Sequence, residues 1–225
     1  MGIDVRSLIL EKLKQSTRVH HHHASKSMDI LRLHLSIEEY GVLLQRLWGF
    51  YTPLETLLAK RGEQAFTSLN YDRRKKAPLL ECDLHALGVF IPSFLPLCAR
   101  LPELTDFSQV LGCMYVLEGA TLGGQIISRH IKKAFDIDQT TGCAYFSSYG
   151  AEVNTMWKTF CSVLTAYTST HAIENQILQA ACSTFITFNA WLDESNYETA
   201  LSQAKAHVVS QKGNTYGKRI STGNS

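Results

Sequence analysis

The sequence predicts an all-α fold, a bundle of six to eight helices. Apolar residues recur at steps of three and four through most of the chain, and no stretch alternates convincingly as a strand would. Two capping patterns, Ser36 with Glu39 and Asp106 with Gln109, mark the starts of two helices. A chain of 225 residues, of which 45% are hydrophobic, is long enough for one substantial core.

Composition and charge exclude several classes of protein. A net charge of +2 gives no reason to expect binding to nucleic acid, and the one dense basic run, residues 73–76, is typical of a solvated helix end. No window approaches 18 consecutive apolar residues, and charges interrupt the N-terminus where a signal peptide would be apolar. The six scattered cysteines favour buried thiols over disulfides. We expect a cytoplasmic protein with a single domain over residues 1–205 and a flexible, polar tail over residues 206–225.

The expected helices follow one another closely along the chain. Pro53 is expected to kink or restart the second helix, which ends near Gly62, and Gly88 to end the third. Prolines restrict the next segment to short turns, and residues 136–150 are expected to form an irregular connection. The helices themselves are expected over residues 8–31, 36–62, 72–87, 106–135, 151–167 and 171–201.

The helix over residues 106–135 carries four glycines, each of which costs roughly 1 kcal/mol relative to alanine. At 100° per residue, Gly119 and Gly123 lie about 20° to either side of Gly112, whereas Gly124 points elsewhere. Such a face without side chains admits either a closely packed helix or a flat ligand, and the spacing alone leaves both open. The cluster from 119 to 124 is also where this helix would kink most easily.

The first helix places one histidine of the run at residues 20–23 on its apolar stripe. His21 follows Leu13 and Thr17 at helical steps, whereas the other three histidines are typical of a solvated surface. A buried imidazole needs a partner, either a hydrogen bond within the core or a metal ion. The periodicity leaves these two alternatives open.

Several stretches, in order along most of the chain, resemble the haem oxygenases. LKQSTRVHHHH resembles the pattern L-K-x-A-T-x-x-x-H, whose last histidine is the proximal ligand of haem iron, and four residues after Thr17 stands His21. EEYGVLLQRLWGFYTPLE and RRKKAPLLECDLHALG resemble the second and third helices, and YVLEGATLGGQI resembles the distal helix. YFSSYGAEVNTMWKTF and TFITFNAWL resemble the bacterial subgroup associated with bacteriophytochromes, photoreceptors that bind biliverdin.

The resemblance implies that haem lies between the first helix and a glycine-kinked distal helix in a single-domain bundle of the haem oxygenase type. His21 would be the iron ligand, and bare glycine backbone would let the distal helix approach the opposite face. Lysines would pair with the two propionates, and tyrosines would offer hydroxyl groups. The residues implied to contact haem are Lys14, Thr17, His21, Gly112, Tyr115, Gly119, Gly123, Gly124, Tyr149 and Lys158.

Two positions depart from the family pattern. Many members have Gly-Asp-x-x-Gly-Gly in the distal helix, with the aspartate organising water near bound oxygen, whereas here Ala120 follows Gly119. The expected catalytic wall is therefore Gly119, Ala120 and Gly123, and the role of the carboxylate must pass to water held by another group. Ser162 replaces a second basic residue beside the propionates, so the α isomer of biliverdin is expected on resemblance alone.

The resemblance implies oxidative cleavage of haem to biliverdin, CO and ferrous iron, with haem as both substrate and cofactor. O2 would be the co-substrate, and a ferredoxin or a flavoprotein reductase would supply electrons, because the chain has no GxGxxG nucleotide motif. A bacteriophytochrome would be the acceptor of the biliverdin.

Two alternatives stay open. Ala120 favours a haem-binding or haem-delivery protein of the same fold without turnover. Thiamin hydrolysis or a di-iron site would suit other helical proteins of this superfamily, but no paired Glu-x-x-His motif and no comparable cysteine constellation is present in the sequence.

Overall fold

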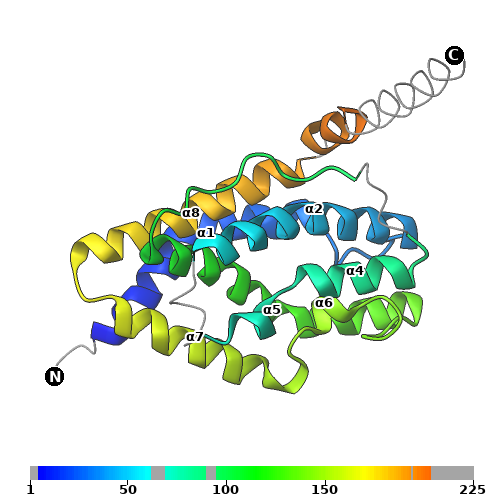
Figure 1. Ribbon diagram of the computed structural model, residues 1–225. Coiled ribbons are helices and arrows are strands. Elements are labelled where there is room, and N and C mark those ends of the chain that lie inside the picture. The colour runs from blue at the N-terminus through cyan, green and yellow to red at the C-terminus, as the bar shows by residue number, and fades with distance from the viewer. Residues whose placement is uncertain (1–4, 62–68, 90–94, 194, 204–225) are drawn as a thin grey trace, which may run out of the picture.

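The computed structural model describes residues 5–61, 69–89, 95–193 and 195–203 as a bundle of helices (Figure 1). These residues include no β-strand, which confirms the predicted all-α class. The predicted domain boundary at residue 205 and the predicted tail over 206–225 lie outside the described residues. The elements are α1 (Val5–Met28), α2 (Ile37–Arg61), η1 (Tyr71–Arg74), α4 (Ala77–Ala86), α5 (Phe107–Phe135), α6 (Ala144–Ser147), η2 (Gly150–Glu152), α7 (Val153–Tyr167) and α8 (His171–Leu192).

The two predicted capping patterns begin α2 and α5. Ser36 N donates to Glu39 Oε2 at 2.8 Å and Glu39 N donates to Ser36 Oγ at 3.2 Å, so the reciprocal capping box is complete. Asp106 Oδ1 accepts from Gln109 N at 3.0 Å. The Gln109 side chain accepts from Thr105 N at 2.6 Å, so it extends the cap by one residue instead of returning to Asp106.

Several helices differ from the predictions, and the first of them ends at Met28 and not at residue 31. The third helix begins at Ala77 because Pro78 occupies its first turn, and the preceding residues form the separate 3-10 turn η1. Pro53 lies inside a continuous α2. The last predicted helix ends at Leu192, after which Asp193 Oδ1 accepts from Ser195 N at 3.1 Å and begins a separate helical segment over residues 195–203.

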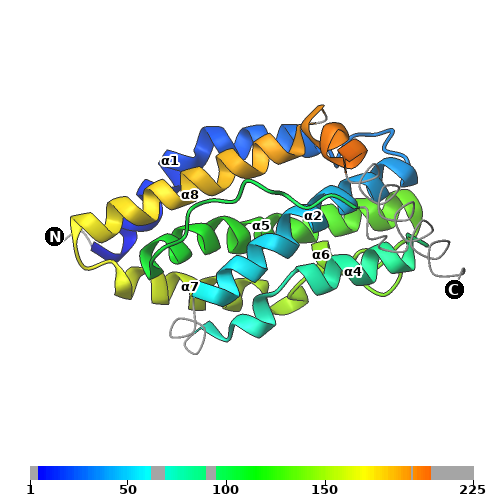
Figure 2. The ribbon, with the colours of Figure 1, turned by 45° about the horizontal axis from the view of Figure 1, so that its top comes forward.

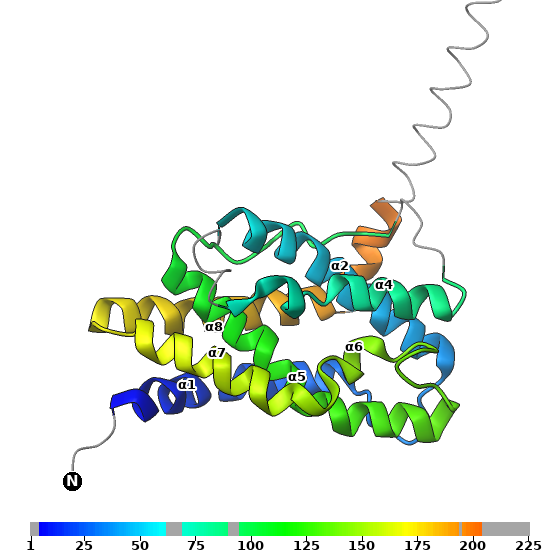
Figure 3. The same ribbon diagram turned by 60° about the horizontal axis from the view of Figure 1, so that its bottom comes forward.

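The bundle is organised around α5, which packs against α8, α7, α6 and α2. Figures 1 and 2 show α1 and α8 side by side, and α1 makes its main contacts with α8 and α7. Figure 3 shows α6 between α4 and α5. This arrangement leaves α1 facing α5 without close packing between them, and the candidate site lies in that space.

Among the described residues, α5 is the one helix long and apolar enough to cross a membrane by length and composition. Half of its most apolar window, 50%, is buried inside the bundle. Burial of this kind is typical of the central helix of a soluble bundle, because its apolar surface is already covered by neighbouring helices.

Candidate functional site

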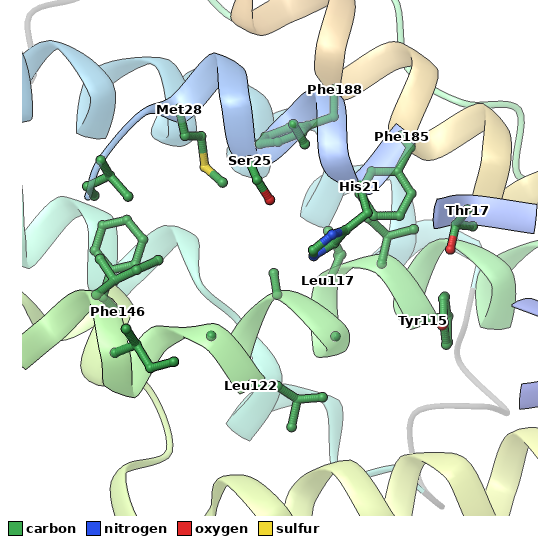
Figure 4. Close-up of a pocket in the computed structure, with 18 of the residues that line it drawn as sticks. Thr17, His21, Ser25, Met28, Tyr115, Leu117, Leu122, Phe146, Phe185 and Phe188 are labelled. Carbon is green, nitrogen blue, oxygen red and sulfur yellow. The ribbon is translucent and has the colours of Figure 1, made fainter. Parts of the chain in front are cut away.

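A largely apolar pocket of about 680 Å³ separates α1 from α5. Its volume lies within the range of sites that enclose a small organic ligand or cofactor. Figure 4 shows side chains from both helices pointing into it, with Phe146 at one end and two aromatic rings of α8 closing another side. The aromatic residues that line it are Phe50, Tyr51, Tyr115, Tyr145, Phe146, Trp157, Phe185 and Phe188.

His21 projects from α1 into this pocket, toward α5 (Figure 4). Its ring packs edge-to-face against Phe185 with ring centroids 6.0 Å apart, and no hydrogen bond to the ring is present among the described residues. Because the side chain is exposed to the open pocket, the alternative of a hydrogen-bonded histidine in the core is wrong. One turn earlier on the same face, buried Thr17 Oγ1 donates to Leu13 O at 2.7 Å.

His20 does not line the pocket. Its backbone carbonyl accepts from Asn189 Nδ2 at 3.1 Å, which fixes this part of α1 on α8. The helical step of 100° between neighbouring residues therefore separates the two histidines, and His21 is the one that a ligand in the pocket can reach.

Opposite His21, α5 presents bare backbone at two glycines. A Cβ atom at Gly119 would meet only Trp157, at 4.0 Å, and a Cβ atom at Gly123 would meet nothing within 4 Å. Both glycines and Ala120 line the pocket. The predicted wall of Gly119, Ala120 and Gly123 is thus brought together on one side of the pocket, facing the imidazole across it.

Gly112 and Gly124 lie in helix contacts and not in the pocket wall. A Cβ atom at Gly112 would collide with the carbonyl oxygen of Ile177 on α8 and lie 2.8 Å from Ala180 Cβ. A Cβ atom at Gly124 would collide with the carbonyl oxygen of Phe146 on α6. The pocket-lining residues of α5 run from Tyr115 to Ile127, which leaves Gly112 outside, and Gly124 faces the backbone of α6 instead of the pocket. The four glycines therefore divide between a ligand wall and two sites of close packing.

Of the lysines and tyrosines predicted to contact haem, two line the pocket and two do not. Lys14 and Tyr115 line the pocket, whereas Lys158 is exposed on α7 and does not. Tyr149 lies outside the pocket and joins a buried polar cluster. Sequence reasoning missed Arg18, which lines the pocket four residues after Lys14, a spacing that could have indicated it.

A buried cluster of charged side chains lies directly behind the glycine wall. Glu118, which precedes Gly119, is paired with Arg74, and both are almost fully buried. Tyr149 Oη donates to Glu118 Oε1 at 2.8 Å, and Lys76 Nζ donates to Tyr149 Oη at 2.8 Å. Burial raises the pKa of Glu118, with the nearby charges of Arg74 and Lys76 opposing that shift.

The prediction that residues 73–76 form a solvated basic run is therefore wrong for two of its members. Arg74 and Lys76 are 4% and 2% exposed. Arg74 Nε donates to Leu69 O at 2.7 Å, and Lys76 N donates to Glu55 Oε1 at 2.5 Å. The buried carboxylates of Glu55 and Glu118 compensate these charges, and neither was identifiable as a partner before the helices were placed together.

No group of three or more His, Cys, Asp or Glu side chains suited to a metal ion occurs within the described ranges. A di-iron carboxylate centre needs such a group. The described part of the chain therefore offers a single imidazole at the pocket, which suits an axial ligand to a metal already held by a macrocycle.

Comparisons with known proteins agree with this geometry. The family model described as Heme oxygenase matches residues 7–194. A protein of Xanthomonas campestris pv. campestris (strain 8004) named Heme oxygenase is 25% identical over 166 residues, which cover 71% of this chain and 92% of that protein.

Solved structures share the fold at lower identity. The heme oxygenase of Neisseria meningitidis matches with a TM-score of 0.69 and 18% identity, over 84% of this chain and 92% of its own. Heme oxygenase-1 of the cyanobacterium Synechocystis, solved in complex with heme, matches with a TM-score of 0.60 and 17% identity, over 93% and 99% of the two chains. The family match spans the pocket and every helix around it, and the chain therefore belongs to the heme oxygenase family.

Proposed function

We propose that this protein cleaves haem oxidatively to biliverdin, CO and ferrous iron, using O2 and electrons supplied from outside. One observation carries the proposal: His21 faces the bare backbone of Gly119 and Gly123 across an apolar pocket of about 680 Å³. Haem would be both the substrate and the cofactor. Membership of the heme oxygenase family supports degradation of haem in general.

The pocket residues fit the chemistry of haem. The macrocycle is flat and apolar, which suits the aromatic lining, and its two propionates suit Lys14 and Arg18 on α1. His21 would hold the iron from one side. The haem, when bound, supplies an iron centre that activates O2 and a macrocycle that is itself oxidised.

The protein's own residues exclude bulk water from the pocket and position the ligand within it. Phe146, Phe185 and Leu117 surround the pocket with apolar surface, which keeps bulk water away from a bound ligand. The absence of side chains at Gly119 and Gly123 leaves room for a small molecule between α5 and the ligand. Ala120 adds only a methyl group to that wall, so the wall itself carries no carboxylate.

Electron supply and product transfer are proposed from the resemblance. The described residues are helical and include no strand-turn-helix unit that would bind a nucleotide, so a ferredoxin or a flavoprotein reductase is the proposed donor. The subgroup-like stretches over α6, α7 and α8 support a bacteriophytochrome as the acceptor. The α isomer of biliverdin is proposed from the resemblance to the haem oxygenases, and a cytoplasmic location is proposed with it.

The test is a spectroscopic titration followed by turnover. Haem added to the purified protein is expected to give a Soret band that saturates at one equivalent. Addition of ascorbate or of a ferredoxin with its reductase in air is then expected to replace that band with the absorption of biliverdin, whose isomer chromatography identifies. A stable haem complex that yields no bilin with either donor would contradict the proposal.

A haem-binding or haem-delivery protein without turnover is the second candidate. Ala120 favours it, because the pocket wall lacks the acidic side chain that many family members have at this position. The same experiment separates the two functions. Under the second, haem bound to the protein survives the donor and is transferred to an apo-acceptor such as apomyoglobin.

A further inference from the structure

The α5 wall of the pocket offers no polar side chain where it faces His21. Beyond Tyr115, every α5 residue that lines the pocket within the described part of the chain is apolar. A polar group that meets a ligand at this wall must therefore come from an element other than α5.

A second, water-sized cavity of about 10 Å³ lies behind this wall. Leu117, Ala120 and Phe146 line both spaces, so the cavity adjoins the pocket along apolar side chains. Lys76 and Thr121 line the small cavity alone, whereas the Tyr51 and Tyr145 rings border both. The cavity thus connects the buried charged cluster with the distal side of the pocket.

Two donors at this cavity have protons to spare. Lys76 Nζ carries three, of which two are donated, to Arg74 O at 2.7 Å and to Tyr149 Oη at 2.8 Å. Tyr51 Oη accepts from Tyr145 Oη at 2.9 Å, while its own proton has no acceptor among the described residues. Buried donors are rarely left without acceptors, so an acceptor belongs in the cavity.

A water molecule satisfies these requirements. The cavity has about the space that one water needs, and such a water needs two to four polar partners. Lys76 and Tyr51 would donate to its oxygen, and its own two protons would remain for other acceptors. A ligand beyond Ala120 is one of them.

We propose that Lys76 is a positioning residue that, together with Tyr51, holds one water molecule behind Ala120 and directs a hydrogen bond and a positive charge toward the ligand between His21 and Gly119. This inference rests on the proposed function, because the ligand in question is haem with a diatomic molecule. It identifies a group able to compensate for the carboxylate that Ala120 lacks.

The surroundings of Lys76 make its charge sensitive to pH. Burial lowers its pKa to about 8, while Glu118 and Glu55 oppose that shift. Burial raises the pKa of all three neighbouring tyrosines, so they stay neutral where Lys76 titrates. The titratable and charged groups around Lys76 are Tyr51 and Glu55 from α2, Arg74 from η1, Glu118 from α5, Tyr145 from α6 and Tyr149 beside η2.

The infrared stretch of CO bound to the ferrous haem complex tests the proposal without turnover. A hydrogen bond or positive charge near the oxygen end of CO lowers this frequency. The wild-type frequency is expected to be low at pH 7 and to rise as the pH passes about 8. Lys76→Met is expected to give the higher CO frequency both at pH 7 and above pH 8. Tyr51→Phe is expected to raise the frequency at pH 7 part of the way toward that of Lys76→Met.

Lys75→Met is the matched control, because Lys75 is the sequence neighbour but pairs with Asp72 at the surface, at 2.6 Å. It is expected to behave as the wild type. Burial also raises the pKa of Glu55 and Glu118, so the loss of the pH dependence in Lys76→Met assigns the midpoint to Lys76.

Bilin formation measured in parallel separates the two proposals. A wild-type protein that makes bilin while Lys76→Met and Tyr51→Phe leave the CO frequency unchanged overturns this inference alone. A frequency that shifts as expected without bilin formation supports the inference and overturns the proposed turnover. If Lys76→Met does not fold, as judged by circular dichroism, Tyr51→Phe decides, and an unchanged frequency in that variant overturns the inference.

Discussion

Alanine substitutions at Gly112 and Gly123 are expected to change stability in opposite directions. Both positions lie inside α5, where alanine is favoured over glycine by about 1 kcal/mol. At Gly123 the new methyl group meets nothing within 4 Å, so this gain is retained and Gly123→Ala is expected to be more stable by about 1 kcal/mol. For a chain of this length, that corresponds to a rise in Tm of about 2–4 °C.

At Gly112 the new methyl group collides with backbone. The Ile177 carbonyl and Ala180 Cβ, at 2.8 Å, can move away only if α8 shifts. Overpacking of this kind costs about 1–3 kcal/mol, so after the helical gain Gly112→Ala is expected to lose up to about 2 kcal/mol.

Urea denaturation of the haem-free variants measures both effects, and a haem titration measures the pocket. Gly123→Ala places its methyl group in the ligand's space, so we expect its haem affinity to fall by about tenfold, equivalent to about 1.4 kcal/mol. Gly112→Ala is expected to bind haem as the wild type does once folded. The reasoning is refuted if Gly112→Ala is the more stable variant, or if Gly123→Ala binds haem unchanged.

Three further predictions follow from the pocket and its supports. His21→Ala is expected to lose the wild-type Soret spectrum in a haem titration, whereas His20→Ala is expected to keep it, because of these two histidines His21 alone lines the pocket. The reverse result would show that His20, and not His21, is the iron ligand. Lys14→Ala is expected to weaken haem binding by up to about fivefold and Lys158→Ala not at all, as competition with apomyoglobin would measure; equal effects would contradict the placement of the two lysines. Burial raises the pKa of Asp83 to about 6, above its unfolded value. This group therefore stabilises the fold below pH 4, and a contribution of up to about 3 kcal/mol is lost as the pH rises to 6. Urea titrations are expected to show that the free energy of unfolding depends less on pH in Asp83→Asn than in the wild type, and an identical pH dependence would contradict this role.

Local signals in the sequence predicted much of the fold. The capping box at Ser36 and the cap at Asp106 are satisfied within three residues, and the predicted end of α5 at Phe135 agrees with the structure. Pro78 carried the signal for the break before α4, which the predicted helix over residues 72–87 overlooked. Interactions of this kind need no knowledge of the rest of the chain.

The site was predictable only in part, because helical spacing tells which face of a helix a side chain occupies but not which element packs against that face. It placed His21 on the inward face of α1, but it could not distinguish a packed core from an open pocket. It grouped Gly112 with Gly119 and Gly123, although α8 covers Gly112 alone. The partners Arg74 and Glu118 are 44 residues apart, so their pairing depends on the packing of η1 against α5.

The division of the α5 glycines has a consequence for how a ligand enters and leaves. Close backbone contacts hold this helix at Gly112, against α8, and at Gly124, against α6, so the bare stretch between them is fixed at both ends. The opposite wall, α1, makes its main contacts with α8 and α7. The α5 wall of the pocket therefore keeps its shape, so a ligand as large as haem must enter and leave past the side chains around the pocket and not by displacing this stretch of α5.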